Sequence, residues 1–248
     1  MKKWARQKDH GHTHADINER VSNAAKTSPI RDLVYGAVDG TITTFAIVSG
    51  VAGAGMSQQV IVVLGIANVL ADGFSMAASN YLGTRTEQEN HRRIVATEYR
   101  HLEEFPDGEV AELEAILSSH GLSGDDLTKG VDVITKCKPL WVSLMLAGEY
   151  GISASEPRPL VSAVATFIAF ILCGALPLVP FIVGLENAYI IASLITGLTF
   201  IAIGATKSAW SIDSWVKSSL QTFLIGSCAA LIAYATGALV SEIGSVLL

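Results

Sequence analysis

The chain has 248 residues, of which 50% are hydrophobic and 16% are charged, and its mean hydropathy is +0.43. Ordinary water-soluble domains are less apolar and carry more charge, so much of this chain is expected to have lipid as its solvent. The formal net charge of -6 argues against a nucleic-acid partner, because binding a polyanion requires clustered Lys and Arg side chains.

The N-terminal segment is a polar tail of mixed charge. It has no apolar core followed by small residues at a cleavage site, so a removable signal peptide is not expected. Its alternating histidines, His10, His12 and His14, could capture transition metals transiently, or could simply belong to a solvated tail.

Five runs of the chain are apolar enough to cross a bilayer, which takes about 20 helical residues. They cover residues 33–54, 60–82, 160–183, 188–206 and 220–240. The sequence therefore predicts an all-α integral membrane protein with five transmembrane helices. The expected parts are a tail (1–31), two spans (32–83), a helical cytoplasmic domain (84–158) and three further spans (159–248).

The placement of Lys and Arg predicts the orientation, because positive residues in short flanking segments stay on the cytoplasmic side. These residues occur in the tail, in 84–158 and in the loop 207–217, but are absent from the turn 55–59 and from the turn around Glu186. The tail, the inserted segment and the last loop are thus expected in the cytosol.

The inserted segment is expected to be helical throughout. The second span should continue as one helix to Glu104, because 85–104 contains no helix breaker. Pro106 and Gly108 then break it, and further helices are expected over 107–119, after Ser123 and from Pro139 onward.

Ionisable residues inside a span are costly and usually mark a pathway. Asp39 lies in the first span and Asp72 in the second, where helical spacing places Asp72, Met76 and Asn80 on one face. A carboxylate with a thioether suits a transition metal better than calcium or magnesium. In the alternative interpretation, Met76 only fills a gap between helices and Asp72 bonds a neighbouring backbone.

The first span also contains the pattern Gly36-x-x-x-Gly40, with Asp39 inside it. Two glycines at this spacing permit the close approach of another helix. The first span is therefore expected to pack against itself in a symmetric homodimer, which would bring one Asp39 from each subunit near a shared axis.

The inserted segment carries three pairs of possible metal ligands, each pair on one face of a helix. They are Glu98 with His101, Glu109 with Glu112, and Met145 with Glu149. If these helices bundle, the pairs could converge on one or several divalent ions. The alternative is a solvated charged face, which is the commoner fate of surface carboxylates.

At these residues the chain resembles the vacuolar iron transporter family. The matching stretches are 35–40, 71–76, 174–181 and the acidic insert between the second and third spans. The resemblance implies a homodimer that exports ferrous iron, and often manganese, from the cytosol in exchange for protons. It also implies that Asp39 and Met76 handle the ion, and that metal binds to cytoplasmic residues at the positions of Glu98, Glu109, Glu112, Met145 and Glu149.

Three positions depart from the family pattern. His101 stands in place of a glutamate, Leu146 in place of a methionine, and Asn80 in place of a common acidic residue. An imidazole in the cluster should make metal binding more sensitive to pH, because its protonated form cannot bind a metal ion.

The expected function is therefore proton-coupled transport of a divalent transition metal, with no prosthetic group and no enzymatic activity. The membrane would be the cell membrane in a bacterium, or that of a vacuole or another organelle in a eukaryote. Two alternatives remain: a membrane-anchored metal-binding or sensor module, and a di-iron oxidase. The oxidase requires a second Glu-x-x-His motif besides Glu98 to His101, and the sequence has none.

Overall fold

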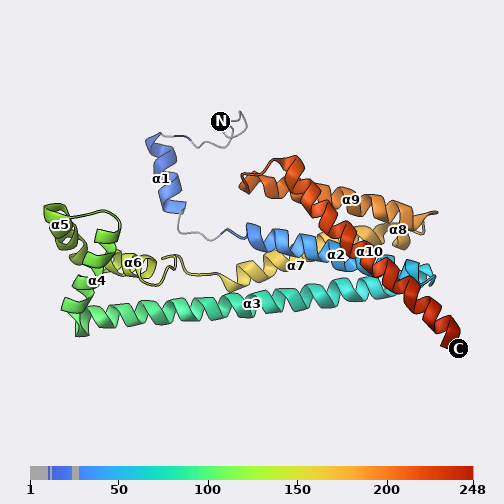
Figure 1. Ribbon diagram of the computed structural model, residues 1–248, viewed down its shortest axis with the longest axis horizontal. Helices are drawn as coiled ribbons and strands as arrows, with labels where there is room; N and C mark the ends of the chain where they lie inside the picture. The colour runs from blue at the N-terminus through green and yellow to red at the C-terminus, as the bar shows by residue number, and fades with distance from the viewer. Residues whose placement is uncertain (1–10, 12, 24–27, 248) are drawn as a thin grey trace. The chain divides into compact units, whose positions relative to one another are not determined.

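The computed structural model describes residues 11, 13–23 and 28–247, and these residues form helices and no strands. The chain divides into two compact units (Figure 1). The apolar unit comprises Pro29–Thr84 and Pro159–Leu248, and the inserted unit comprises Arg85–Arg158 together with Met1–Ser28. Of the tail histidines, His14 opens the short helix α1 (His14–Asn23), whereas His10 and His12 lie outside the described residues.

Five helices are long and apolar enough to cross a membrane, as the sequence predicts. They are α2 (Ile30–Gly53), α3 (Gln58–Glu104), α7 (Pro159–Ala175) with its continuation, α9 (Ala188–Lys207) and α10 (Trp215–Leu247). The third begins as α7, passes through a 3-10 turn (Leu176–Leu178) and ends as α8 (Val179–Ile182). Pro177 and Pro180 explain the interruption, because proline has no N–H to continue the helical bonding.

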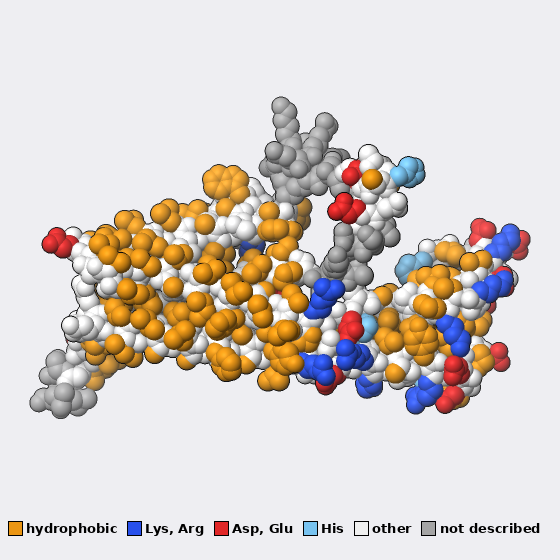
Figure 2. All heavy atoms as spheres, turned by 180° about the vertical axis from the view of Figure 1, so that it is seen from behind, with side chains coloured by type: hydrophobic (Ala, Val, Ile, Leu, Met, Phe, Trp, Pro, Cys, Tyr) orange, Lys and Arg blue, Asp and Glu red, His pale blue; other side chains and the backbone are white. Residues whose placement is uncertain are grey.

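Hydrophobic side chains cover the apolar unit (Figure 2). Phe74 of α3 is 69% exposed and Leu231 of α10 is 70% exposed. A water-soluble protein seldom leaves large apolar patches uncovered, whereas a bilayer covers them without cost. The surface therefore agrees with the composition in assigning this unit to lipid.

Helix α2 is the most enclosed element of the apolar unit. Its residues 32, 36, 40, 44 and 48 recur every four positions and are all buried. Two of them are Gly36 and Gly40, where an added Cβ would strike the backbone carbonyl oxygens of Thr166 and Phe170 on α7.

The Gly36-x-x-x-Gly40 motif therefore packs against α7 within one chain. The homodimer itself stays a prediction, and it would need a different face of α2. Asp39 lies beside the buried stripe and is half-buried.

The other end of α2 packs equally closely against α10. A Cβ on Gly53 would strike the carbonyl oxygen of Tyr234, and one on Gly237 would strike that of Gly50. Backbone therefore meets backbone at both ends of α2. This geometry is typical of membrane helices, where small residues rather than a hydrophobic driving force allow helices to associate.

The inserted unit begins where α3 continues past the apolar unit, and α3 ends at Glu104 as predicted. Three helices follow, α4 (Pro106–Ser119), α5 (Gly124–Thr135) and α6 (Lys138–Gly148), close to the predicted ranges. They enclose a hydrophobic core with α3 that consists of Ile94, Leu102, Leu113, Leu117, Val131, Trp141, Val142, Met145 and Leu146.

The segment that follows α6 runs back along α3. Gln88 donates a hydrogen bond to the carbonyl oxygen of Pro157, His91 contacts that of Ser153, and Arg92 pairs with Glu156. The three contacts recur over one turn of α3. These contacts hold the segment 153–157 against α3.

Candidate metal sites

Two glutamates occupy the hydrophobic core of the inserted unit. Glu98 is 1% exposed and Glu109 is 3% exposed. Glu98 lies four residues after Ile94 and four before Leu102, so an apolar stripe of α3 carries it into the core. Glu109 stands in the first turn of α4, four residues before the buried Leu113.

Each of these carboxylates has one oxygen close to a polar side chain. The Tyr150 hydroxyl donates to Glu98 Oε1 over 2.9 Å, and His101 Nδ1 lies 3.3 Å from Glu109 Oε1. The other oxygen of each glutamate, Oε2, is buried without a hydrogen-bond partner among the described residues. Buried polar atoms are nearly always paired, so these two carboxylate oxygens are atoms of the core that are open to a proton, a water or a cation.

Burial raises the pKa of Glu98 and of Glu109 above the ordinary value of 4.5. The hydrogen bond from Tyr150 works against this shift at Glu98, while the charge of Glu149 adds to it. At Glu109 the charges of Glu98 and Glu112 add to the effect of burial. His101 acts in the opposite direction on both groups. A divalent cation would oppose the raised pKa values further, because it stabilises the charged form of nearby carboxylates.

The other predicted ligands near Glu98 and Glu109 differ in their exposure. Glu112 and Glu149 are exposed, yet their charges act on Glu98. Met145 is fully buried in the hydrophobic core, and Glu149 stands just after the last residue of α6. Among the described residues no three His, Cys, Asp or Glu side chains are arranged to hold a metal ion. The carboxylates are neighbours, and an ion would have to draw them together.

A second group of predicted residues lies in the apolar unit. Asp39 on α2 and Asp72 on α3 are close enough for their charges to interact, and Met76 follows one turn after Asp72 and is half-buried.

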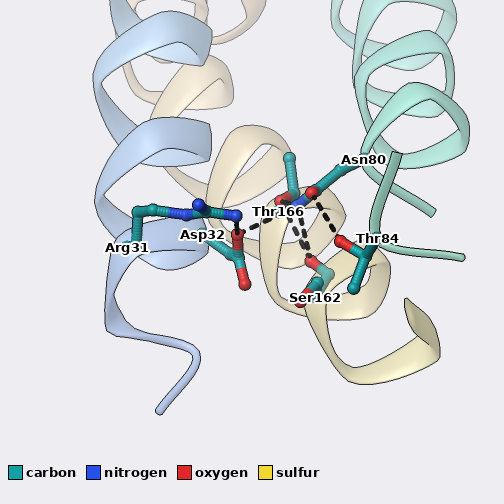
Figure 3. Close-up of polar contacts among 6 residues, drawn as sticks. All are labelled: Arg31, Asp32, Asn80, Thr84, Ser162 and Thr166. Atoms are coloured by element: carbon teal, nitrogen blue, oxygen red, sulfur yellow. Dashed lines mark hydrogen bonds and ion pairs between the residues drawn. The ribbon is translucent and has the colours of Figure 1, made fainter. Parts of the chain in front are cut away.

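Asn80 has a different partner from the one that its spacing predicts. Its amide donates to Asp32 Oδ1 on α2 at 3.1 Å and to Thr166 Oγ1 on α7 at 2.7 Å, and it lies 3.3 Å from the carbonyl oxygen of Ser162. Figure 3 shows this amide directed at the two neighbouring helices, with Thr84 donating to its oxygen. Asn80 therefore ties α2, α3 and α7 together.

Sequence reasoning did not single out Asp32 or Tyr150. Asp32 is 5% exposed and is followed every four residues by the buried Gly36 and Gly40, a spacing that could have revealed it. Tyr150 has no such signal, because it reaches Glu98 only after the chain has turned through α4, α5 and α6.

These features define the class of the protein: five lipid-facing helices, the first of which carries a carboxylate, make it a multi-pass membrane protein. The model of the VIT family matches residues 30–238. The chain therefore belongs to the VIT family.

Curated relatives match nearly the whole chain. Vacuolar iron transporter 1 of Eucalyptus grandis is 30% identical over 91% of this chain and 94% of its own length. Vacuolar iron transporter 1 of Tulipa gesneriana is 32% identical over 88% and 89%, respectively. The vacuolar iron transporter of Toxoplasma gondii is 30% identical over 90% of this chain and 78% of its own length.

Proposed function

We propose that this chain carries ferrous iron, and manganese as well, out of the cytosol across a membrane in exchange for protons. The observation that carries the proposal is Asp39, a half-buried carboxylate on an apolar helix with the charge of Asp72 close by. Two acidic groups together in a lipid-facing unit are costly unless a cation or proton visits them. The curated relatives are named iron transporters, so iron is the cation that we propose.

In this proposal Asp39 and Met76 bind the ion during its passage, with Asp72 nearby. Release on the far side follows when protons displace the metal from the carboxylates, which couples the movement of metal to an opposite movement of protons. The protein would act as a homodimer, because the half-exposed side of α2 that carries Asp39 is then covered by the same side of the partner.

The inserted unit is proposed to face the cytosol and to collect the ion there. Glu98 and Glu109 would supply buried oxygens, and Glu112 and Glu149 would close on the ion from the surface. Met145 would contribute its sulfur only if the core opened slightly, since the side chain is fully buried. Carboxylates favour ferrous iron and manganese over softer ions such as copper(I).

The test is uptake of ferrous iron into proteoliposomes under an imposed pH gradient. The parent should take up iron only with the gradient, Asp39→Ala should lose uptake, and Glu109→Ala/Glu112→Ala should be slower at low iron concentration. Glu103→Ala/Glu104→Ala is the matched control, because it removes the same charge from exposed residues nearby. A folded parent that binds iron but takes none up would refute transport and favour the binding module.

A further inference from the structure

Glu98 and Glu109 share an arrangement that the sequence spacing does not predict. The Tyr150 hydroxyl donates to Oε1 of Glu98, and His101 lies near Oε1 of Glu109, while Oε2 of each is buried and unpartnered among the described residues. A carboxylate without such a neighbour could turn both oxygens toward an ion and bind through two bonds. A held carboxylate offers one oxygen in a fixed direction.

We propose that Tyr150 is a positioning residue for metal binding in the inserted unit: its hydroxyl holds Glu98 so that only Oε2 faces the ion. The inference rests on the proposed metal binding by this unit. Tyr150 does not touch the ion itself.

The position of Tyr150 in the chain supports this role. It directly follows Glu149, whose charge acts on Glu98, and it comes just after α6 ends at Gly148. The hydrogen bond therefore ties the residue two positions after the end of α6 to Glu98 of α3. Outer partners of this kind fix the orientation of metal-binding side chains, and their loss typically lowers metal affinity about 10- to 100-fold.

Tyr99 offers a matched control. Tyr99 directly follows Glu98 on α3, and it is 38% exposed, whereas Tyr150 is 37% exposed. The structure gives the Tyr99 hydroxyl no hydrogen bond within the described part of the chain. Exchanging either tyrosine for phenylalanine removes one oxygen from an equally accessible ring, but only one exchange removes a contact to Glu98.

The experiment titrates the purified full-length protein in detergent with Co²⁺ and records the visible absorption of the bound ion, which depends on the geometry of its ligands. Tyr150→Phe is expected to weaken binding about 10-fold and to change the intensity of the absorption bands, because Glu98 can then rotate. Tyr99→Phe should match the parent in both. The thermal unfolding midpoint of each metal-free variant shows whether the fold is intact.

Two outcomes would overturn the inference in distinguishable ways. If Tyr150→Phe reproduces the affinity and bands of the parent while Glu98→Gln/Glu109→Gln loses them, the unit binds metal without help from Tyr150. If Glu98→Gln/Glu109→Gln itself titrates like the parent, the inserted unit holds no Co²⁺, and its proposed role in collecting metal fails together with that of Tyr150.

Discussion

Glu98 and Glu109 keep their carboxylates inside a hydrophobic core, and burial raises the pKa of both groups. A raised pKa in the folded state means that the folded chain binds more protons than the unfolded chain above pH 4.5. The free energy of unfolding of the metal-free unit must then fall as pH rises. Stability is greatest below the ordinary pKa and is lost as pH passes through the raised values.

Hydrogen exchange of α4 in the metal-free, full-length protein measures this effect. After correction for intrinsic rates, α4 amides should exchange faster at pH 7.5 than at pH 5. The free energy of opening should be lower at pH 7.5 by about 1.4 kcal/mol for each unit by which a pKa is raised. Glu109→Gln should flatten the dependence, whereas Glu114→Gln, at an exposed position of the same helix, should not. Protection that increases with pH would contradict the assignment.

Asn80 is the residue on which the contact between α2, α3 and α7 depends. Asn80→Ala leaves the Asp32 carboxylate buried without its amide partner, which should cost about 1–3 kcal/mol. The thermal unfolding midpoint in detergent should fall accordingly. Asn90→Ala, at an exposed position of the same helix, is the control and should unfold like the parent. Equal midpoints for both variants would show that the contact contributes little.

Among the elements, α2 and α7 approach so closely that only glycine fits between them. In Gly40→Ala the new methyl group would strike the Phe170 carbonyl oxygen, so the unfolding midpoint should fall despite the better helix propensity of alanine. Gly83→Ala is the control, because nothing lies within 4 Å of its added Cβ. That variant should gain about 0.5–1 kcal/mol. A stabilised Gly40→Ala would contradict the close packing.

The elements themselves follow from the sequence to a large extent. Apolar length predicts the five long helices, and the lack of a breaker in 85–104 predicts that α3 is continuous. Pro106 and Pro139 predict the starts of two short helices, because proline has no N–H to donate and fits the first turn of a helix. Local chemistry decides these features, so one sequence is enough to read them.

The partners of the helices could not be read in the same way. Gly36 and Gly40 predict a close neighbour, but nothing in their spacing says whether α7 or a second copy supplies it. Likewise, Glu98 and His101 share a helical face, yet Glu98 bonds Tyr150 and His101 contacts Glu109 on α4. Tertiary pairing depends on residues far apart in the chain, which local periodicity does not encode.

For the whole molecule, the native cysteines offer a test of the expected orientation. Cys137 is exposed just before α6, whereas Cys173 and Cys228 lie on the apolar helices α7 and α10. Maleimides react with thiolates, which form in water and not in lipid. A membrane-impermeant maleimide should therefore label Cys137 in inside-out vesicles and leave sealed right-side-out vesicles unlabelled.

Cys137→Ser is the control for this labelling and should abolish it. Labelling of the parent in right-side-out vesicles alone would place the inserted unit on the side opposite to the cytosol. The Lys and Arg distribution would then be a misleading guide to orientation, and the unit could not collect metal from the cytosol.

The close contacts of α2 at both its ends also have a genetic consequence. Gly36 and Gly40 face α7, while Gly53 faces α10, so each of the three leaves too little room for a larger side chain. Alleles that enlarge them should be lost from a library selected for function. Alleles that exchange one lipid-facing leucine of α10 for another aliphatic residue should persist, so inherited variation in this chain should accumulate on its outermost helix and spare its first.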